Sequence, residues 1–428
     1  MAPTATFKTN EATLPWEKGA SWDVKVIELS PEPPAPWTLD SWRSKPAAQA
    51  VEYEDPDVLQ TVCDTLKHLP PLVSPEEVEA ARHDFYNAAV GKSFIIQGGD
   101  CAESFLDVRH DIIRRKVELL HEQSRILEAA LSKPVLRIGR IAGQFAKPRS
   151  NPLETLPSSE VVHAFRGHII NSEDENDRTP DPTRLLAGYF HSAVAHNTLR
   201  QLQATGHGQP IFTSHEALHL PYESSLSRED YNLSATTIWL GERTRQLDGA
   251  HVEYARGLRN PLGVKIGPST TPEEIVALLD VLSPDRSPPG KITLITRLGH
   301  KRVRSVLPAL IRAVQLSGHV PVWMSDPCHG NTFTTADGHK TRRVSDLLHE
   351  LKESYAVHRE LGSHLGGIHL EQTGDAVTEC LDEVHVTDPG DLAEAYISLC
   401  DPRLSVDQAL DVVRVFAGFV KGYKQGSW

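Results

Sequence analysis

Eight short apolar runs alternate with helical segments along most of this chain, and no other feature constrains the fold as strongly. The runs are typical of β-strands and cover residues 92–98, 134–142, 209–213, 234–240, 261–266, 291–297, 321–325 and 366–371. Helical periodicity predicts helices over 109–131, 183–204, 272–282, 301–317, 341–361 and 405–421, with shorter ones over 216–228 and 246–258. This order predicts an α/β protein built on a parallel (β/α)8 barrel, the TIM barrel.

A doubly wound open sheet is the alternative architecture for such an alternation. It would carry a glycine-rich phosphate-binding turn directly after its first strand. The first strand is instead followed by Gly98-Gly99-Asp100-Cys101, which is not the dinucleotide-binding pattern. We therefore favour the barrel.

The chain divides into three regions by composition. Residues 1–36 are rich in proline and glutamate and predict an extended arm. Residues 37–90 predict a helical N-terminal extension, with a helix starting at Ser74-Pro75-Glu76-Glu77, where Ser74 and Glu77 have the spacing of a capping box. Residues 91–428 predict the catalytic barrel domain.

Charge and cysteine content exclude several classes of protein. A net charge of −13 argues against non-specific nucleic-acid binding. No apolar run has the length of a membrane span, and the N-terminal residues do not have the pattern of a signal peptide. Five cysteines are few, odd in number and without paired spacing, which fits a reducing compartment. We expect a cytoplasmic protein with no nucleic-acid or membrane partner.

Four residues of metal-binding type stand in short polar segments: Cys101, His329, Glu371 and Asp401. Three of them follow or end predicted strands, which would bring them to one end of the barrel. A thiolate, an imidazole and two carboxylates suit a divalent transition metal such as manganese, cobalt, zinc or iron. Each residue alone also fits an ordinary role, and Cys101 alone would be read as a small buried hydrophobe. The shared placement favours a metal site.

Charged side chains also gather at the predicted strand ends and in the loops after them. They are Arg140, Lys147, Arg149, Glu216, Glu242, Arg243, Lys265, Arg297 and Lys340, with Ser150 beside Arg149. Catalytic sites of barrels form where these ends meet. A basic residue at a loop is often only solvated, but Arg140, Lys265 and Arg297 stand within apolar runs, where a structural role needs a buried partner. The set predicts a binding site for phosphorylated and carboxylated small molecules.

Several long motifs carry a family resemblance: WTLDSWRSK (37–45), QGGDCAESF (97–105), RIAGQFAKPRS (140–150), TSHEAL (213–218), WLGERTRQLDGAH (239–251), NPLGVK (260–265), SDPCHGNT (325–332), GGIHLE (366–371) and CDPRL (400–404). In this order they closely resemble the class II 3-deoxy-D-arabino-heptulosonate 7-phosphate (DAHP) synthases. The resemblance implies a metal-dependent transferase on a (β/α)8 barrel. It would condense phosphoenolpyruvate with erythrose 4-phosphate, the first step of the shikimate pathway to aromatic amino acids.

The resemblance also implies roles for the residues at matching positions. Cys101, His329, Glu371 and Asp401 would bind the metal, with manganese first among the candidates. Arg140, Glu242, Arg243, Lys265 and Arg297 would bind phosphoenolpyruvate, while Lys147, Arg149, Ser150 and Lys340 would bind the aldose phosphate. Lys265 and Glu216 are the candidates for ordering or deprotonating the attacking water. We expect no organic cofactor and a homodimer or homotetramer.

Some positions depart from the family pattern, and they leave alternatives open. His168 stands where an acidic residue is usual, Thr236 where histidine is usual and Leu365 where proline is usual. His168 is either a loop substitution without consequence or a change that retunes the aldose-phosphate side of the pocket. Two alternatives to the expected activity remain. One is a diverged paralogue of a secondary-metabolite pathway that uses a related aldose phosphate, and the other is a catalytically silent regulatory paralogue. A metal hydrolase or aldolase of another barrel family would not need so many cations.

Overall fold

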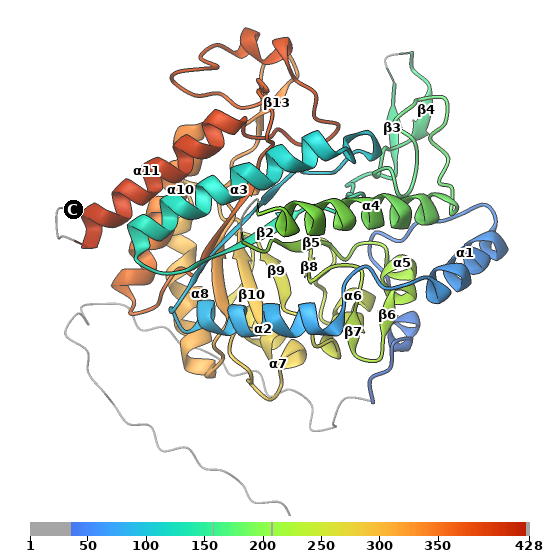
Figure 1. Cartoon of the computed structure of the whole chain (residues 1–428), viewed down its shortest axis with the longest axis horizontal. Coiled ribbons are helices and arrows are strands. Elements are labelled where there is room, and N and C mark those ends of the chain that lie inside the picture. The colour runs from blue at the N-terminus through green and yellow to red at the C-terminus, as the bar shows by residue number, and fades with distance from the viewer. Residues whose placement is uncertain (1–35, 157, 207–208, 425–428) are drawn as a thin grey trace, which may run out of the picture. The chain divides into compact units, whose positions relative to one another are not determined.

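Eight parallel strands form a closed barrel in the computed structural model (Figure 1). The structure describes residues 36–156, 158–206 and 209–424, so the predicted arm lies outside the described residues except for residue 36. The barrel strands are β1 (Phe94–Gly99), β2 (Val135–Arg140), β5 (Phe212–Glu216), β8 (Thr237–Leu240), β9 (Leu262–Ile266), β10 (Ile292–Thr296), β11 (Val322–Ser325) and β14 (Gly367–Glu371). Each pairs with its neighbours in chain order, and β1 pairs with β14 to close the ring.

The predicted barrel is therefore confirmed, with one displaced strand. The third strand was predicted over 209–213, but β5 runs over Phe212–Glu216. The prediction followed the apolar residues, whereas His215 and Glu216 continue the strand with polar side chains. Polar residues at this end are expected of a barrel strand whose C-terminal end faces a site.

Helices follow the strands and pack around the barrel. They are α3 (His110–Leu131), α4 (Arg184–Ala204), α5 (Leu220–Ser225), α6 (Ala250–Arg256), α7 (Pro272–Leu282), α8 (Val303–Ser317), α9 (Pro327–Gly330), α10 (Val344–Glu360) and α11 (Val406–Lys424). In α7, Thr271 and Glu274 form a capping box before an apolar stripe at Ile275, Leu278, Leu279 and Leu282. The stripe is buried in the cluster that joins the helices to β8, β9 and β10. None of the described helices is both long and apolar enough to cross a bilayer.

The N-terminal region is helical, as predicted, and contains η1 (Ser41–Ser44), α1 (Pro56–His68) and α2 (Pro75–Ala89). The predicted capping box is present, since Ser74 and Glu77 each bond the other's main chain. Phe85 and Ala88 of α2 pack against inward-facing barrel residues such as Ile95 and Ile295. This helix crosses the barrel at the N-terminal ends of its strands (Figure 1). The open end for a site is consequently the opposite one.

Two small hairpins project from loops at the C-terminal ends of the strands (Figure 1). One pairs β3 (Leu153–Thr155) with β4 (Val161–His163) after β2, and the other pairs β12 (Phe333–Thr334) with β13 (Lys340–Thr341) after β11. A third, formed by β6 (Ser227–Arg228) and β7 (Tyr231–Asn232), follows α5. The remaining elements are two short 3-10 helices, η2 (Phe105–Asp107) and η3 (Pro389–Glu394). None of these pieces was predicted, because two- and three-residue strands carry no readable periodicity.

Candidate active site

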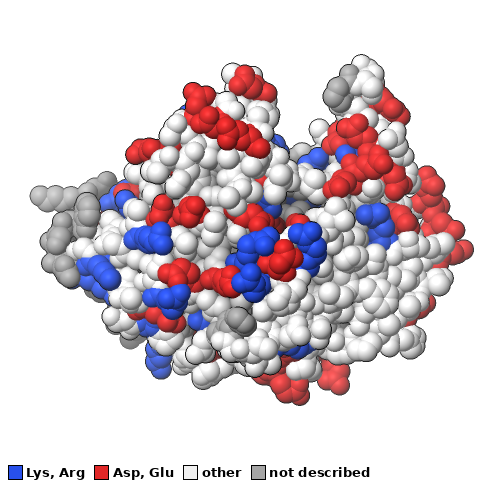
Figure 2. Space-filling model, turned by 45° about the horizontal axis from the view of Figure 1, so that its top comes forward, with Lys and Arg blue, Asp and Glu red and all other residues white. Residues whose placement is uncertain are grey.

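A cavity of about 220 Å³ opens at the C-terminal ends of the strands. Among its lining residues are Cys101, Arg140, Lys147, Glu216, Glu242, Arg243, Lys265, Arg297, His329, Glu371 and Asp401, all predicted from the sequence. Figure 2 turns this face toward the viewer and shows Lys and Arg side chains around a hollow near its middle, with Asp and Glu on the projections above. The fold thus gathers residues spread over 300 positions around one space.

Three other predicted residues do not line the cavity. Arg149 donates to Glu154 at 2.9 Å, in the hairpin that projects beside the site. Ser150 Oγ accepts from the Arg243 guanidinium at 3.1 Å, which connects it to a lining residue. Lys340 is exposed, and its ammonium lies 3.5 Å from Asp401. Each of the three therefore lies one contact or more from the cavity wall.

The donor atoms of Cys101, Glu371 and Asp401 lie within 4.8 Å of one another. The Lys147 ammonium donates to both the Cys101 sulfur and the Asp401 carboxylate, so the group already accommodates a positive charge. His329 lies outside this tight cluster, but its Nε2 is 2.9 Å from Glu371 Oε1. A soft sulfur donor beside two carboxylates and an imidazole fits a divalent transition metal.

The two carboxylates of this group are held in their charged form. Burial opposes the charge on Glu371, but His329, Arg342 and Arg140 together keep its pKa well below the ordinary value. Burial likewise opposes the charge on Asp401, and Lys147 lowers its pKa. Burial raises the pKa of the Cys101 thiol well above its ordinary value, and a hydrogen bond with Cys400 acts in the same direction.

Asp326 is a functional residue that the sequence analysis missed. It is completely buried, and its carboxylate accepts hydrogen bonds from Lys265 and from the main-chain N–H groups of Cys328 and His329. Its Oδ2 also lies 2.7 Å from His329 Nδ1. A carboxylate on Nδ1 leaves the Nε2 lone pair free to bind a metal. Its position directly after the seventh strand, like that of the other site residues, was the available signal.

His369 was also missed, although it stands two residues before Glu371 and so on the same face of β14. Its Nε2 lies 2.7 Å from an Arg140 nitrogen and 3.2 Å from the Lys265 ammonium. Burial, with Lys265 and Arg140, holds the pKa of His369 well below its ordinary value. Its Nδ1 lies 2.9 Å from Gln97 Oε1, an acceptor. The imidazole is therefore neutral, carries its proton on Nδ1 and accepts from both cations with Nε2.

Lys265 and Glu216 both lie in the cavity wall with pKa values displaced toward neutrality. Burial lowers the pKa of Lys265, an effect that Asp326 partly offsets. Burial raises the pKa of Glu216, an effect that Lys265 and Arg140 partly offset. Glu216 Oε1 is buried and has no hydrogen-bond partner among the described residues. A buried carboxylate oxygen without a partner leaves an acceptor to be satisfied by a bound water molecule or by substrate.

His168 lies away from this cavity. Its Nδ1 accepts from the main-chain N–H of Phe105 at 3.0 Å, and its Nε2 lies 3.1 Å from Glu173. It is buried and is not a lining residue of the cavity. These contacts oppose the interpretation that His168 retunes the substrate pocket, and they also differ from a surface substitution without consequence, because the buried imidazole bonds the start of η2.

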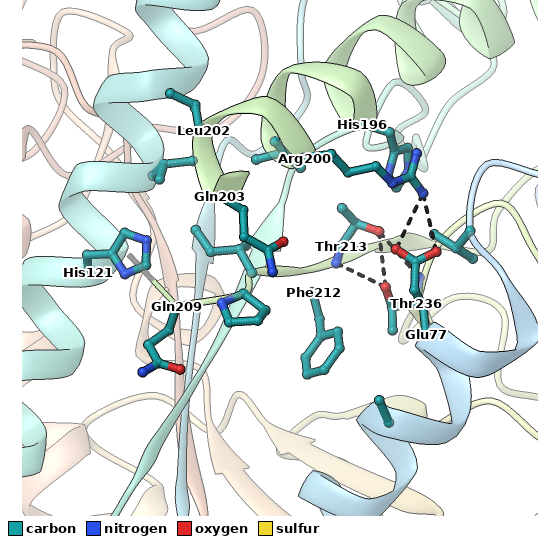
Figure 3. A pocket seen from close by; sticks show the side chains of 16 residues that line it. Glu77, His121, His196, Arg200, Leu202, Gln203, Gln209, Phe212, Thr213 and Thr236 are labelled. Carbon is teal, nitrogen blue, oxygen red and sulfur yellow. Dashed lines mark hydrogen bonds and ion pairs between the residues drawn. The ribbon is translucent and has the colours of Figure 1, made fainter. Parts of the chain in front are cut away.

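A second cavity, of about 250 Å³, lies between α2, α3 and α4 and shares no lining residue with the first. Figure 3 shows the Glu77–Arg200 ion pair on one side of it, with Thr213 and Thr236 facing each other beside the pair. The two hydroxyl oxygens are 3.4 Å apart. Thr236, one of the departures from the family pattern, thus contacts the barrel strand that carries Glu216.

Comparisons with known proteins show which family the chain belongs to. The sequence profile of the class-II DAHP synthetase family matches residues 37–211 and 207–417. The phospho-2-dehydro-3-deoxyheptonate aldolase of Neurospora crassa is 42% identical over 461 residues, which span 91% of this chain and 95% of the relative. The enzyme of the same name from Streptomyces coelicolor is 40% identical over 442 residues, spanning 90% and 97%.

A solved structure supports the fold alone. The phospho-2-dehydro-3-deoxyheptonate aldolase of Francisella tularensis superposes with a TM-score of 0.50 at 17% identity, covering 84% of this chain and 96% of that one. The matched profile spans nearly all of the described chain, and the relatives align almost end to end. On these grounds the chain belongs to the class-II DAHP synthetase family.

Proposed function

We propose that the protein condenses phosphoenolpyruvate with erythrose 4-phosphate and water, giving DAHP and inorganic phosphate. The observation that carries this proposal is the cavity in which four cations, Arg140, Arg243, Lys265 and Arg297, face a cluster of metal-binding donors. The names of the relatives support the same reaction.

The cations suit phosphoenolpyruvate, which carries both a phosphate and a carboxylate. Arg140 is already fixed, because its guanidinium donates to the carbonyl oxygens of Asp100 (2.8 Å) and Cys101 (2.9 Å). One oxygen of the Glu242 carboxylate lies 2.8 Å from the Arg245 guanidinium, and the other lies 3.9 Å from the Arg297 guanidinium. Fixed cations orient a substrate at little entropic cost and offset the loss of its hydration.

A divalent metal, manganese foremost with cobalt, zinc and iron as alternatives, would be held by Cys101, His329, Glu371 and Asp401. When bound it supplies a Lewis acid for the aldehyde oxygen of the second substrate. Asp326 orients His329 for this purpose, and Lys147 and Arg342 balance the charge of the carboxylates.

Proton movements fall to Glu216 and Lys265. The methylene carbon of phosphoenolpyruvate attacks the aldehyde carbon, and water adds at the second carbon of phosphoenolpyruvate. The Glu216 carboxylate accepts a hydrogen bond or a proton from that water, and the Lys265 ammonium can return a proton. The C–O bond to phosphate then breaks and phosphate leaves. The raised pKa of Glu216 and the lowered pKa of Lys265 suit proton transfer near neutral pH.

The aldose phosphate would enter between the two hairpins. Lys147 lies in the wall, while Arg149, Ser150 and Lys340 lie outward of it. The Arg243–Ser150 contact connects the two substrate regions. A phosphate held by these outer residues would place the aldehyde end of the sugar inward, toward the metal-binding donors.

A substrate-exchange assay tests the proposal. The purified protein is given manganese and phosphoenolpyruvate with erythrose 4-phosphate, ribose 5-phosphate, arabinose 5-phosphate or no aldose, and loss of phosphoenolpyruvate is followed by its ultraviolet absorbance. We expect rapid loss with erythrose 4-phosphate only, and none after chelation. Preference for another aldose phosphate would indicate that the protein is a diverged paralogue with a different substrate. No turnover with any aldose would indicate that it is a catalytically silent paralogue. Light scattering would test the expected homodimer or homotetramer.

A further inference from the structure

We propose that Glu103 is a positioning residue for the reaction: its carboxylate holds the turn at residues 141–147 and, through that turn, Glu216. This inference rests on the proposed function, because Glu216 is the group that orders the attacking water. Glu103 belongs to the motif that contains Cys101, but it does not line the cavity, and its side-chain hydrogen bonds go to main-chain groups.

The hydrogen bonds of the Glu103 carboxylate are with main-chain groups, and the buried Lys116 also acts on its charge. Glu103 is buried, with 4% of its surface exposed. Its carboxylate accepts from the N–H groups of Ala142 (3.2 Å), Gly143 (3.0 Å) and Gln144 (3.0 Å). Its own N–H donates to the Gln144 carbonyl at 2.7 Å. Three convergent amides stabilise a carboxylate and in turn take their geometry from it.

The turn that Glu103 holds is one that the chain would not adopt unaided. Ala142 has a φ of 69°, in the left-handed region, which costs a residue with a Cβ about 1 kcal/mol or more. The next residue must be glycine, because a Cβ on Gly143 would lie 2.3 Å from His215 Nδ1. The turn is therefore pressed against β5 in a conformation that needs outside support.

Active-site groups depend on this turn to different degrees. The Gln144 side-chain oxygen accepts from the Glu216 N–H at 2.8 Å, which fixes the end of β5. Lys147, at the end of the turn, reaches Cys101 and Asp401. Arg140 precedes the turn and is anchored independently by Asp100, Cys101 and His369. Relaxing the turn should move Glu216 and Lys147 while leaving Arg140 in place.

Glu103→Gln is the primary test, because the amide has nearly the same shape but turns an N–H₂ group toward main-chain donors. We expect kcat to fall about 100-fold, the scale of a misplacement near 1 Å. The KM for phosphoenolpyruvate should stay within about threefold, since the cations that bind it do not depend on the turn. Glu103→Asp, which keeps the charge, should lose less.

A glycine at position 142 tests whether Glu103 acts by holding the turn or only by stabilising the whole protein. Ala142→Gly removes the left-handed strain, because glycine adopts positive φ freely. In the Glu103→Gln background it should restore kcat about tenfold. Glu274→Gln is the matched control: its carboxylate also bonds a main-chain N–H, that of Thr271 at 3.0 Å, but on an exposed helix start that does not line the cavity. It should leave kcat and KM unchanged.

Three kinetic outcomes would overturn the inference: an unchanged kcat in folded Glu103→Gln, a loss expressed mainly in the KM for phosphoenolpyruvate, or no rescue by Ala142→Gly. Thermal unfolding of the two single variants and the double variant gives a readout independent of turnover. Coupling between positions 103 and 142 should appear there too, and its absence would also reject the proposal. Wild-type turnover is measured alongside, so an inactive wild type would count against the proposed function and not against the coupling.

Discussion

Asp326 Oδ2 lies 2.7 Å from Nδ1 of His329, and the same carboxylate accepts a hydrogen bond from Lys265. One buried anion therefore contacts both the imidazole that we propose as a metal ligand and the ammonium that we propose as a proton donor. The pKa of Asp326 lies well below its ordinary value, because His329 and Lys265 outweigh the effect of burial. The carboxylate is charged throughout the range in which enzymes work.

Asp326→Asn should lower metal affinity about 10- to 100-fold, because an uncharged partner no longer orients and polarises the imidazole. Titration with a divalent metal, read by calorimetry and by turnover, measures the change. Asp280→Asn is the matched control, since Asp280 lies 2.9 Å from His319 in a similar pair outside the cavity. Equal metal affinity in wild type and Asp326→Asn would refute the role.

From the proposed metal ligands we expect that Cys101→Ser and His329→Ala lose both bound metal and turnover while the barrel remains folded. Metal content by mass spectrometry and secondary structure by circular dichroism measure the two effects. Cys63→Ser serves as control, because Cys63 is a buried thiol of α1 that contacts Pro221 and no site residue. Full activity in chelator-treated wild type would contradict the assignment.

His168→Asp should leave the Michaelis constants for both substrates unchanged, because His168 does not line the cavity. It should instead cost about 1 kcal/mol of stability, since a second carboxylate would be buried beside Glu173 in place of the imidazole that lies 3.1 Å from it. Steady-state kinetics measures the Michaelis constants of His168→Asp, and urea denaturation measures its stability. An increased affinity for erythrose 4-phosphate would revive the interpretation that this position tunes the aldose site.

Stability should fall in mild acid because of His358, whose pKa burial lowers to about 3. An unfolded histidine titrates near pH 6.5, so below that pH the unfolded chain binds a proton that the folded chain excludes. Between pH 6.5 and 5 this group alone should cost about 2 kcal/mol. His358→Gln should reduce the difference in urea stability between pH 7 and 5, whereas His83→Gln, at an exposed site, should not. Equal pH dependence in all three proteins would refute the prediction.

Sequence patterns predicted the barrel well because apolar strands repeat with regular spacing, and α2 was readable from its capping box at Ser74. They also predicted the residues that carry charge into the cavity, such as Arg297, since such residues interrupt apolar runs. His369 escaped because its importance lies in contacts with Arg140 and Lys265 on other strands, which no single segment reveals, whereas Asp326 was overlooked although it directly follows a predicted strand. Glu103 escaped because its partners are main-chain N–H groups, which leave no trace in the sequence.

The most direct test of the central claim is a phosphorus NMR time course of the manganese-loaded protein with phosphoenolpyruvate and erythrose 4-phosphate in ¹⁸O-water. We predict that the two substrate resonances fall together, that DAHP and inorganic phosphate rise in equal amounts, and that the phosphate contains no ¹⁸O, because water attacks carbon and the C–O bond breaks. Phosphoenolpyruvate that persists beside erythrose 4-phosphate, or phosphate that carries the label, would contradict the account.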